Sequence, residues 1–555
     1  MSFPAIIIAD TQHSFLGLPS RIADELLDRT ILDITLTRLA SIPEIDQIII
    51  VHPESQAPQS LITTSIDKPL YYFPHNHTPN VTHRNWQSGR KWALTAWRGG
   101  LGWSSIFDES LPAKPLADAL AHYKQDAAFI VRADWPLFDL QSASQLITRH
   151  REAPEALRFC FTQSPPGLAG YIASQSTFQQ FTDHNASFGQ ILGYSHSQPM
   201  LDPISRDANI AIPPAVRDCN RRFVYDTARS VALVNQLASH LGKSLISATN
   251  LQIATAANEI ETSNPLLHYQ SLPQQITLEL TPNRSLDGPL TVQHYITPDR
   301  EPITIDHAHK VIKQIAVDPN NDIVLTFAGV GDSLLHPQYK EIIIAAHDAG
   351  VLGIALETDL HINNPDQLAS LHDLPIDLLI TNLNADSEQA YQRVMNSSDY
   401  NTPFFNIESL LNTRLQRQRD FNPAFIPWII PSFLKTKLNL EDMDSFFARW
   451  MYHAKHALIR PFQTAIGKLP DLSPVPMQPP KRKPCSQLAN RLTILSDGSV
   501  LQCDQDITAQ SPLGNMSQQP LLELWQSQFT IYASHTQHCF DCNKLCASCS
   551  EWFRP

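Results

Sequence analysis

The C-terminal stretch CFDCNKLCASC, residues 539–549, contains four of the eight cysteines in a chain of 555 residues. Cys485 and Cys503 lie upstream of it. Such density in a chain otherwise poor in cysteine indicates a metal site or a set of disulfides. Between these two cysteines, residues 492–503 read LTILSDGSVLQC, two apolar runs around an Asp-Gly turn. This pattern predicts a β-hairpin that brings Cys503 back towards Cys485.

The spacing Cys-x12-Gly-x4-Cys is followed by Leu513-Gly514-Asn515, by a helix with Leu524-Trp525 and by the terminal cysteines. This order resembles the SPASM domain, which holds auxiliary iron–sulfur clusters behind radical S-adenosylmethionine (radical SAM) enzymes. Soft thiolates suit iron–sulfur clusters, and the resemblance implies one 4Fe–4S cluster. The six cysteines could hold a second cluster only with a ligand missing. A four-cysteine zinc site and disulfides remain alternatives. The implied ligands are Cys485, Cys503, Cys539, Cys542, Cys546 and Cys549.

Length and composition narrow the function classes. A chain of this length predicts three domains. The net charge of −13 argues against a general nucleic-acid binder. No apolar run reaches the length of a membrane span, and the first strand does not resemble a signal peptide. We therefore expect a cytoplasmic protein that binds neither membrane nor nucleic acid. Its partner is expected to be an unidentified protein, peptide or small molecule.

Residues 1–235 predict a doubly wound α/β domain. Helical spacing is predicted over 22–39 and 228–241, and residues 236–270 are predicted to link this domain to the next. The apolar runs that predict its strands are 5–10, 45–51, 127–132, 157–161 and 169–173.

Two motifs of this first domain resemble the nucleotidyltransferases that activate sugars and acids. They are Ser20-Arg21-Ile22 and Ala133-Asp134-Trp135-Pro136-Leu137. The resemblance implies that Arg21 contacts a nucleotide and that Asp134 binds Mg²⁺. However, Glu25 stands where the family has lysine, and a carboxylate there repels a triphosphate by about 1–4 kcal/mol per charge pair. The altered loop therefore argues against nucleotide and Mg²⁺ binding.

Residues 271–470 predict a partial barrel of six β/α units, with its active face at the carboxyl ends of the strands. The predicted strands are 276–280, 323–327, 351–357, 376–383, 425–430 and 457–461. The predicted helices are 304–316, 337–349, 386–395, 405–418 and 440–454.

The barrel resembles radical SAM enzymes in its glycine-rich stretch at 328–337. The resemblance implies that Gly329, Gly331 and Asp332 contact SAM. The family places its Cys-x3-Cys-x2-Cys motif after the first strand, and those positions are Ser285, Pro289 and Val292 here. A cluster that cleaves SAM needs three thiolates there, so the sequence argues against SAM chemistry.

The same cysteine spacing occurs at Cys542, Cys546 and Cys549, but outside any barrel strand. The whole chain, with residues 475–555 as its SPASM domain, resembles the spiro-SPASM proteins. Two functions remain open. One is a cluster-bearing protein with a redox, docking or binding role and two enzyme-like domains that do not catalyse. The other is an enzyme, either a radical SAM/SPASM-type modifying enzyme or a retargeted nucleotidyltransferase.

Overall fold

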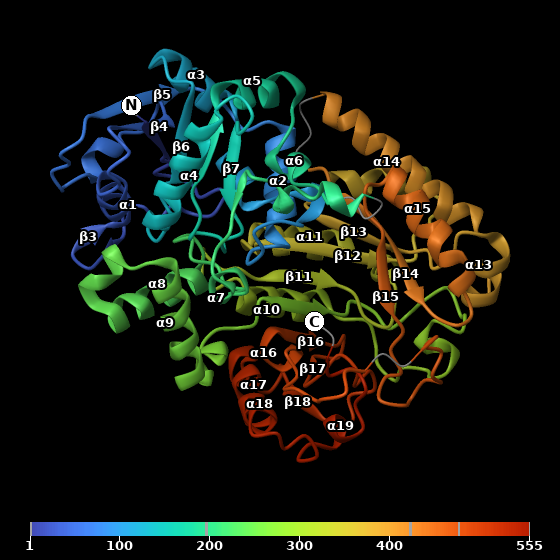
Figure 1. Cartoon of the computed structure of the whole chain (residues 1–555). Coiled ribbons are helices and arrows are strands. Elements are labelled where there is room, and N and C mark those ends of the chain that lie inside the picture. The colour runs from blue at the N-terminus through green and yellow to red at the C-terminus, as the bar shows by residue number, and fades with distance from the viewer. Residues whose placement is uncertain (1–2, 195–197, 421–424, 476–477, 554–555) are drawn as a thin grey trace. The chain divides into compact units, whose positions relative to one another are not determined.

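The computed structural model describes residues 3–194, 198–420, 425–475 and 478–553 (Figure 1). It divides into two compact units. The first comprises Met1–Asn264 with Asp318–Asn320, and the second comprises Pro265–Val317 with Asn321–Pro555. Each unit is built around its own largely parallel sheet, which confirms the predicted α/β class.

The sheet of the first unit has the order β5-β4-β1-β6-β8-β7-β9. The pairs β5–β4, β4–β1 and β1–β6 are parallel, whereas β8 runs antiparallel to both of its neighbours. Its central strands are buried on both faces, which explains their continuous apolar runs. The strands are β1 Pro4–Ile8, β4 Gln47–Pro53, β5 Leu70–His75, β6 Ala127–Arg132, β7 Phe159–Thr162, β8 Tyr171–Ser174 and β9 Asn209–Ile210.

The first helix begins later than its hydrophobic spacing predicts. Helix α1 spans Ile31–Ala40, and a small hairpin of β2 (Glu25–Leu26) and β3 (Arg29–Thr30) precedes it. The prediction of a helix from residue 22 was wrong because Thr30 caps this helix: its Oγ1 accepts a hydrogen bond from Asp33 N at 3.0 Å.

The remaining helices of the first unit include two in the segment predicted as a linker. Residues 236–264 include the end of α8 and all of α9, and both helices belong to this unit. Thr227 caps α8 and Thr249 caps α9. The helices are α2 Val81–Lys91, α3 Lys114–His122, α4 Leu140–Glu152, α5 Gln175–His184, α6 Phe188–Ile191, α7 Pro214–Arg217, α8 Ala228–Leu241 and α9 Asn250–Ser263.

The second unit contains every strand predicted for the barrel. From β15 to β10 the neighbours pair in parallel, in the order β15-β14-β13-β12-β11-β10. Their carboxyl ends therefore meet at one edge of the sheet. The strands are β10 Gln275–Leu278, β11 Val324–Phe327, β12 Gly353–Thr358, β13 Leu378–Asn382, β14 Trp428–Lys435 and β15 Leu458–Pro461. The helices are α10 Ile305–Ile315, α11 Tyr339–Asp348, α12 Pro365–Ser370, α13 Glu388–Met395, α14 Asn401–Asp420 and α15 Met443–His453.

The predicted hairpin of the tail continues this same sheet. Strand β16 (Arg491–Ile494) pairs in parallel with β10, then antiparallel with β17 (Ser499–Leu501), which pairs with β18 (Pro512–Asn515). The short helices of the tail are α16 Gln487–Asn490, α17 Leu521–Ser527, α18 Phe529–Thr536 and α19 Lys544–Ala547.

The tail also shares the hydrophobic core of the barrel. Leu492 and Trp525 belong to the same buried cluster as the barrel residues Leu278 and Phe327. Trp525 stacks on Tyr269, and the Tyr269 hydroxyl donates to Leu488 O at 2.7 Å. Barrel and tail are thus one packed body.

Candidate functional site

Four cysteines of the tail gather where its hairpin and its last short helix meet. Cys485 precedes α16, Cys503 follows β17, and Cys546 and Cys549 lie in and after α19. Each thiol lies within electrostatic range of at least one other: Cys503 interacts with Cys485 and Cys549, and Cys546 with the same two. We call Cys485, Cys503, Cys546 and Cys549 the four-thiol set.

Burial keeps these thiols protonated in the absence of a metal. It raises the pKa of Cys546 to about 12 and the pKa of Cys503 well above its ordinary value. It also raises the pKa of Cys485 and Cys549. A buried thiol becomes a thiolate when a metal replaces its proton.

Hydrogen-bond donors point at the sulfurs of the set. Main-chain N–H groups of Gln487 and Leu488 donate to Cys485, and that of Gln505 donates to Cys503. Glu551 N donates to Cys549 Sγ at 3.3 Å. At Cys546 the donor is a side chain, because Gln502 Nε2 lies 3.4 Å from the sulfur. Donors of this kind stabilise thiolates that bind iron.

Charged neighbours act on the set in opposite directions. The Arg482 guanidinium favours the thiolates of Cys546 and Cys549, and its Nη2 donates to Cys546 O at 2.6 Å. The Asp504 carboxylate disfavours that of Cys503, whose Sγ lies 3.5 Å from Asp504 Oδ1. The Glu551 carboxylate likewise disfavours the thiolate of Cys549. The hydrogen-bond donors and Arg482 outnumber these two acids, so the set fits a cluster of iron and sulfide.

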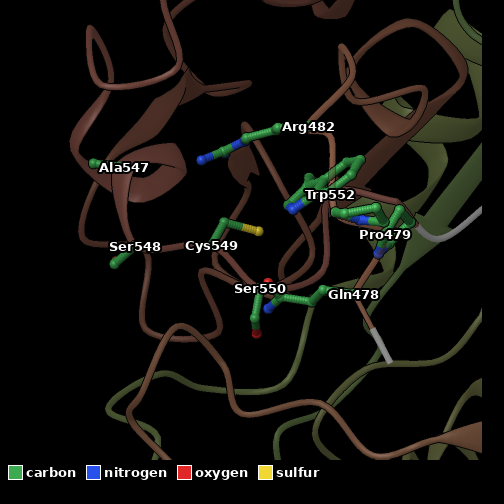
Figure 2. A pocket seen from close by; sticks show the side chains of 9 residues that line it. Gln478, Pro479, Arg482, Ala547, Ser548, Cys549, Ser550 and Trp552 are labelled. Carbon is green, nitrogen blue, oxygen red and sulfur yellow. The ribbon is translucent and has the colours of Figure 1, made fainter. Parts of the chain in front are cut away.

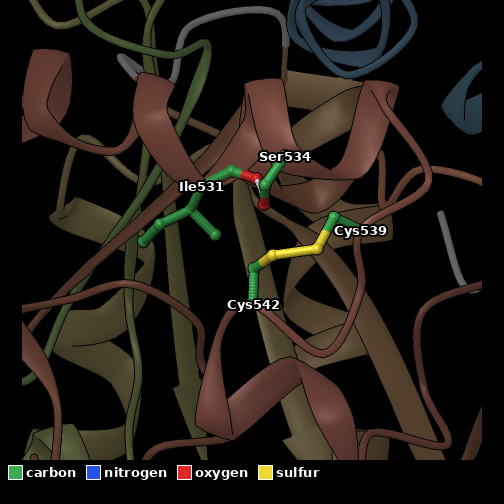
Figure 3. The surroundings of a disulfide bond; sticks show 4 residues. All are labelled: Ile531, Ser534, Cys539 and Cys542. Carbon is green, nitrogen blue, oxygen red and sulfur yellow. Dashed lines mark hydrogen bonds between the residues drawn. A yellow bond between two sulfur atoms is a disulfide. The ribbon is translucent and has the colours of Figure 1, made fainter.

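The other two cysteines of the tail are bonded to each other. Cys539 and Cys542 are joined by a disulfide beside α18 (Figure 3). Within the residues that the structure describes, no three His, Cys, Asp or Glu side chains are placed to hold a single metal ion. A four-iron cluster binds its thiolates at four separate irons, so its ligands stand further apart than those of one tetrahedral ion.

A pocket of about 370 Å³ opens beside the set. Arg482 and Trp552 line it, and the sulfur of Cys549 points inward among the lining side chains (Figure 2). This places one thiol of the set next to solvent-accessible space.

The carboxyl ends of the barrel strands carry ion pairs instead of thiols. Arg300 binds Glu279 through two hydrogen bonds of 2.6 and 2.9 Å. Arg460 binds Glu357 at 3.0 and 2.9 Å. Burial opposes the ionisation of Glu357, but Arg460 outweighs it and holds the pKa of this carboxyl below its usual value.

The third pair joins Arg284 to Asp359. Arg284 Nε donates to Asp359 Oδ2 at 2.7 Å, and the Asp359 side chain is completely buried. Asp332 adjoins this pair and accepts from Asp359 N and Thr358 Oγ1, both at 3.0 Å. Burial and Asp359 raise the pKa of Asp332 to about 6. The acid predicted to contact SAM is therefore bonded within the protein.

The two predicted glycines lie against the loop that follows β10. A Cβ on Gly331 would stand 2.1 Å from Thr281 O, and one on Gly329 would stand 2.7 Å from Glu279 Cγ. Asp332 N donates to Asn283 O at 2.8 Å. The loop after β10 thus packs directly on the glycine-rich stretch. Of the positions where the family has cysteine, Ser285 is exposed, and Pro289 and Val292 are half-buried.

In the first unit the predicted nucleotide residues are also engaged. Both oxygens of Asp134 accept from Arg132, at 2.9 and 3.0 Å. Arg21 pairs with Asp24 at 3.2 Å. Mg²⁺ at Asp134 would have to displace a buried arginine, so these residues do not fit the metal.

A buried charge network adjoins Asp134. Glu109 accepts from Arg90 at 3.0 Å and from Arg222 at 3.0 and 3.1 Å, and Arg132 Nη1 donates to its main-chain oxygen. Burial opposes the ionisation of Glu109, but Arg222 and Arg90 outweigh it and lower its pKa to about 2. Sequence reasoning missed these charges and those of the barrel. The signal available in the sequence was charged residues at the ends of predicted strands: Glu279, Glu357 and Arg460.

These features define a class: an α/β protein with a parallel β/α sheet whose strand ends are closed by ion pairs and whose tail carries a set of buried thiols. Residues 485–550 match the family model of the iron–sulfur cluster-binding SPASM domain. The predicted SPASM domain is confirmed, and this region of the chain binds an iron–sulfur cluster.

Among known proteins, an uncharacterized protein of Treponema pallidum (strain Nichols) is 24% identical over 314 residues, which cover 54% of this chain and 84% of that one. Solved structures with weaker likeness include BtrN in complex with AdoMet and 2-DOIA (12% identity, 50% of this chain and 92% of that one, TM-score 0.33). Another is a cytidylyltransferase from Leptospira borgpetersenii (15%, 48% and 97%, TM-score 0.33). A third is Streptococcus suis SuiB bound to precursor peptide SuiA (10%, 50% and 70%, TM-score 0.37). The fold assignment stands on the strand order of this chain.

Among the described residues, no helix combines the length and the apolar character that crossing a membrane requires.

Proposed function

We propose that this protein binds one 4Fe–4S cluster through Cys485, Cys503, Cys546 and Cys549 and has a redox or docking role. In this proposal the barrel and the first domain bind an unidentified protein, peptide or small molecule and do not catalyse. The proposal rests on a contrast within the second unit. Thiols gather in the tail, whereas the carboxyl ends of the barrel strands carry ion pairs.

The choice of four ligands rests on the donor set. These four thiols interact with one another, and each receives hydrogen bonds that favour a thiolate bound to iron. Cys539 and Cys542 bond to each other instead. When bound, the cluster supplies one-electron transfer. The protein orients its ligands and limits the access of water to them.

The absence of SAM chemistry rests on residues at the barrel. Ser285, Pro289 and Val292 offer at most one hard oxygen where three soft ligands are needed. The loop after β10 packs on Gly331. Arg284, in that loop, is hydrogen-bonded to the carboxylate of Asp359. SAM could therefore enter only by displacing a packed loop. It would also find no iron at this position to bind.

Iron analysis of single variants tests the proposed ligands. After anaerobic reconstitution the wild-type chain should contain about four irons. Cys503→Ala and Cys546→Ala should each contain fewer irons than the wild type, because the iron left without a protein ligand is labile. The control, Cys539→Ser with Cys542→Ser, should keep about four irons. Full iron in Cys546→Ala, or loss of iron in the control, would contradict the ligand assignment.

A second assay separates the proposal from its enzymatic alternative. The reduced, reconstituted protein is incubated with SAM, and 5′-deoxyadenosine is measured. We expect none above the level of Cys546→Ala, a variant that removes a ligand from both the four-thiol set and the Cys542, Cys546, Cys549 motif. Production of 5′-deoxyadenosine that depends on the cluster would replace the proposal with a radical enzyme that uses the terminal cysteines.

A further inference from the structure

We propose that Gln502 is a positioning residue that raises the reduction potential of the cluster through its hydrogen bond to Cys546. This inference rests on the proposed function. Gln502 directly precedes Cys503, and its side chain turns towards the other part of the set. Its Nε2 donates to Cys546 Sγ at 3.4 Å, and the residue is only 4% exposed.

A second side chain fixes the orientation of this amide. Asn543 Nδ2 donates to Gln502 Oε1 at 2.8 Å, which leaves the Nε2 end of the amide facing the sulfur. Asn543 Oδ1 in turn accepts from Leu545 N at 3.0 Å and Cys546 N at 3.3 Å, and so caps α19. One chain of hydrogen bonds therefore holds the start of α19, the glutamine and the ligand together.

The sign of the effect follows from charge. A cluster that accepts an electron places more negative charge on its sulfurs, and an N–H donor stabilises that state more than the oxidised one. The donor thus makes reduction easier. At Cys485, Cys503 and Cys549 the donors include main-chain N–H groups, which substitution of a side chain does not remove. At Cys546 the donor can be deleted without altering a ligand.

The test compares reconstituted full-length proteins by potentiometric titration followed by electron paramagnetic resonance. Gln502→Met keeps the length of the side chain and removes the donor. We expect about four irons and a lower midpoint potential, with the reduced-to-oxidised ratio at a fixed potential falling roughly three- to tenfold. A tenfold change is 59 mV for a one-electron couple. Asn543→Ser, which retains a capping hydroxyl, should shift the midpoint in the same direction by less.

Gln293→Met is the matched control. Gln293 Nε2 donates to Pro282 O and Val330 O in the barrel, so its loss should leave the midpoint unchanged. Full iron with an unshifted midpoint in both Gln502→Met and Asn543→Ser would overturn the inference alone. If Gln502→Met fails to fold, Asn543→Ser decides. A wild-type chain that binds no iron would refute the proposed function and this inference with it.

Discussion

Removal of the Arg284 guanidinium should strongly destabilise the second unit. Arg284 pairs with Asp359, whose side chain has no exposed surface, and Asp332 lies beside them. Burial disfavours the charge of Arg284, but Asp359 outweighs it and raises the pKa of Arg284 above its ordinary value. Arg284→Met keeps most of the apolar stem and leaves two neighbouring carboxylates without their cation.

The expected cost is about 3–5 kcal/mol, the range for breaking a buried pair by removal of one partner. At roughly 2 °C per kcal/mol for a domain of this size, the melting temperature of the second unit should fall by about 6–10 °C. Arg284 also lowers the pKa of Asp332, which is about 6 in the intact protein. Its removal raises that pKa further, so protonation at pH 5 should recover part of the loss.

The measurement is urea unfolding of the wild type, Arg284→Met, Asp359→Asn and the double variant at pH 7.5 and pH 5. The double variant removes both charges, so it should be much more stable than the sum of the single losses predicts. Arg460→Met, which breaks a pair that is a fifth to a third exposed, is the matched control and should cost about 1 kcal/mol or less. A cost under about 1 kcal/mol for Arg284→Met, or additive single losses, would refute the buried-pair argument.

Two further predictions concern stability. Burial, and to a lesser extent Arg417, lowers the pKa of His372 to about 4, below its unfolded value near 6.5. The contribution of neutral His372 to the free energy of unfolding is therefore complete above pH 6.5 and is lost as the pH falls towards 4. His372→Gln should flatten the fall in unfolding free energy over that window by up to about 3 kcal/mol, and equal pH slopes for variant and wild type would contradict this. Gly331→Ala should cost about 3 kcal/mol or more, because its Cβ would meet Thr281 O at 2.1 Å. Gly350→Ala, with a positive φ but open space around its Cβ, should cost about 1–2 kcal/mol. Urea unfolding measures both variants, and equal costs would show that the close contact at Gly331 is not the cause.

Much of this fold could be predicted from hydrophobic periodicity. Each predicted barrel strand is present to within a few residues, because strands buried on both faces leave long apolar runs. The start of α1 could not be read from spacing alone, since Thr30 caps the N-terminus and so sets where the helix begins. Strand β5 was missed because its residues 70–75 are mostly half-exposed aromatic and polar positions.

The candidate site was less predictable than the fold. Cysteine spacing indicated the SPASM domain but could not say which thiols meet. Cys485 approaches Cys546, and Cys503 approaches Cys549, through the packing of the hairpin and α19. Nor does sequence show which charges pair across a sheet. Arg460 and Glu357 lie on β15 and β12, strands that are not neighbours, and only the register of the sheet brings them into contact.

The parallel pairing of β16 with β10 has a consequence for synthesis on the ribosome. Arg491 Nε donates to Gln275 Oε1 across this strand pair, and the two residues are 216 positions apart in the chain. The ribosome therefore delivers β10 and its partner β11 long before β16 emerges. Until then one flank of β10 has no strand to bind, and such flanks recruit strands from other chains. That flank of β10 stays open while the 216 positions up to Arg491 are translated, and a chaperone that covers it would prevent such pairing.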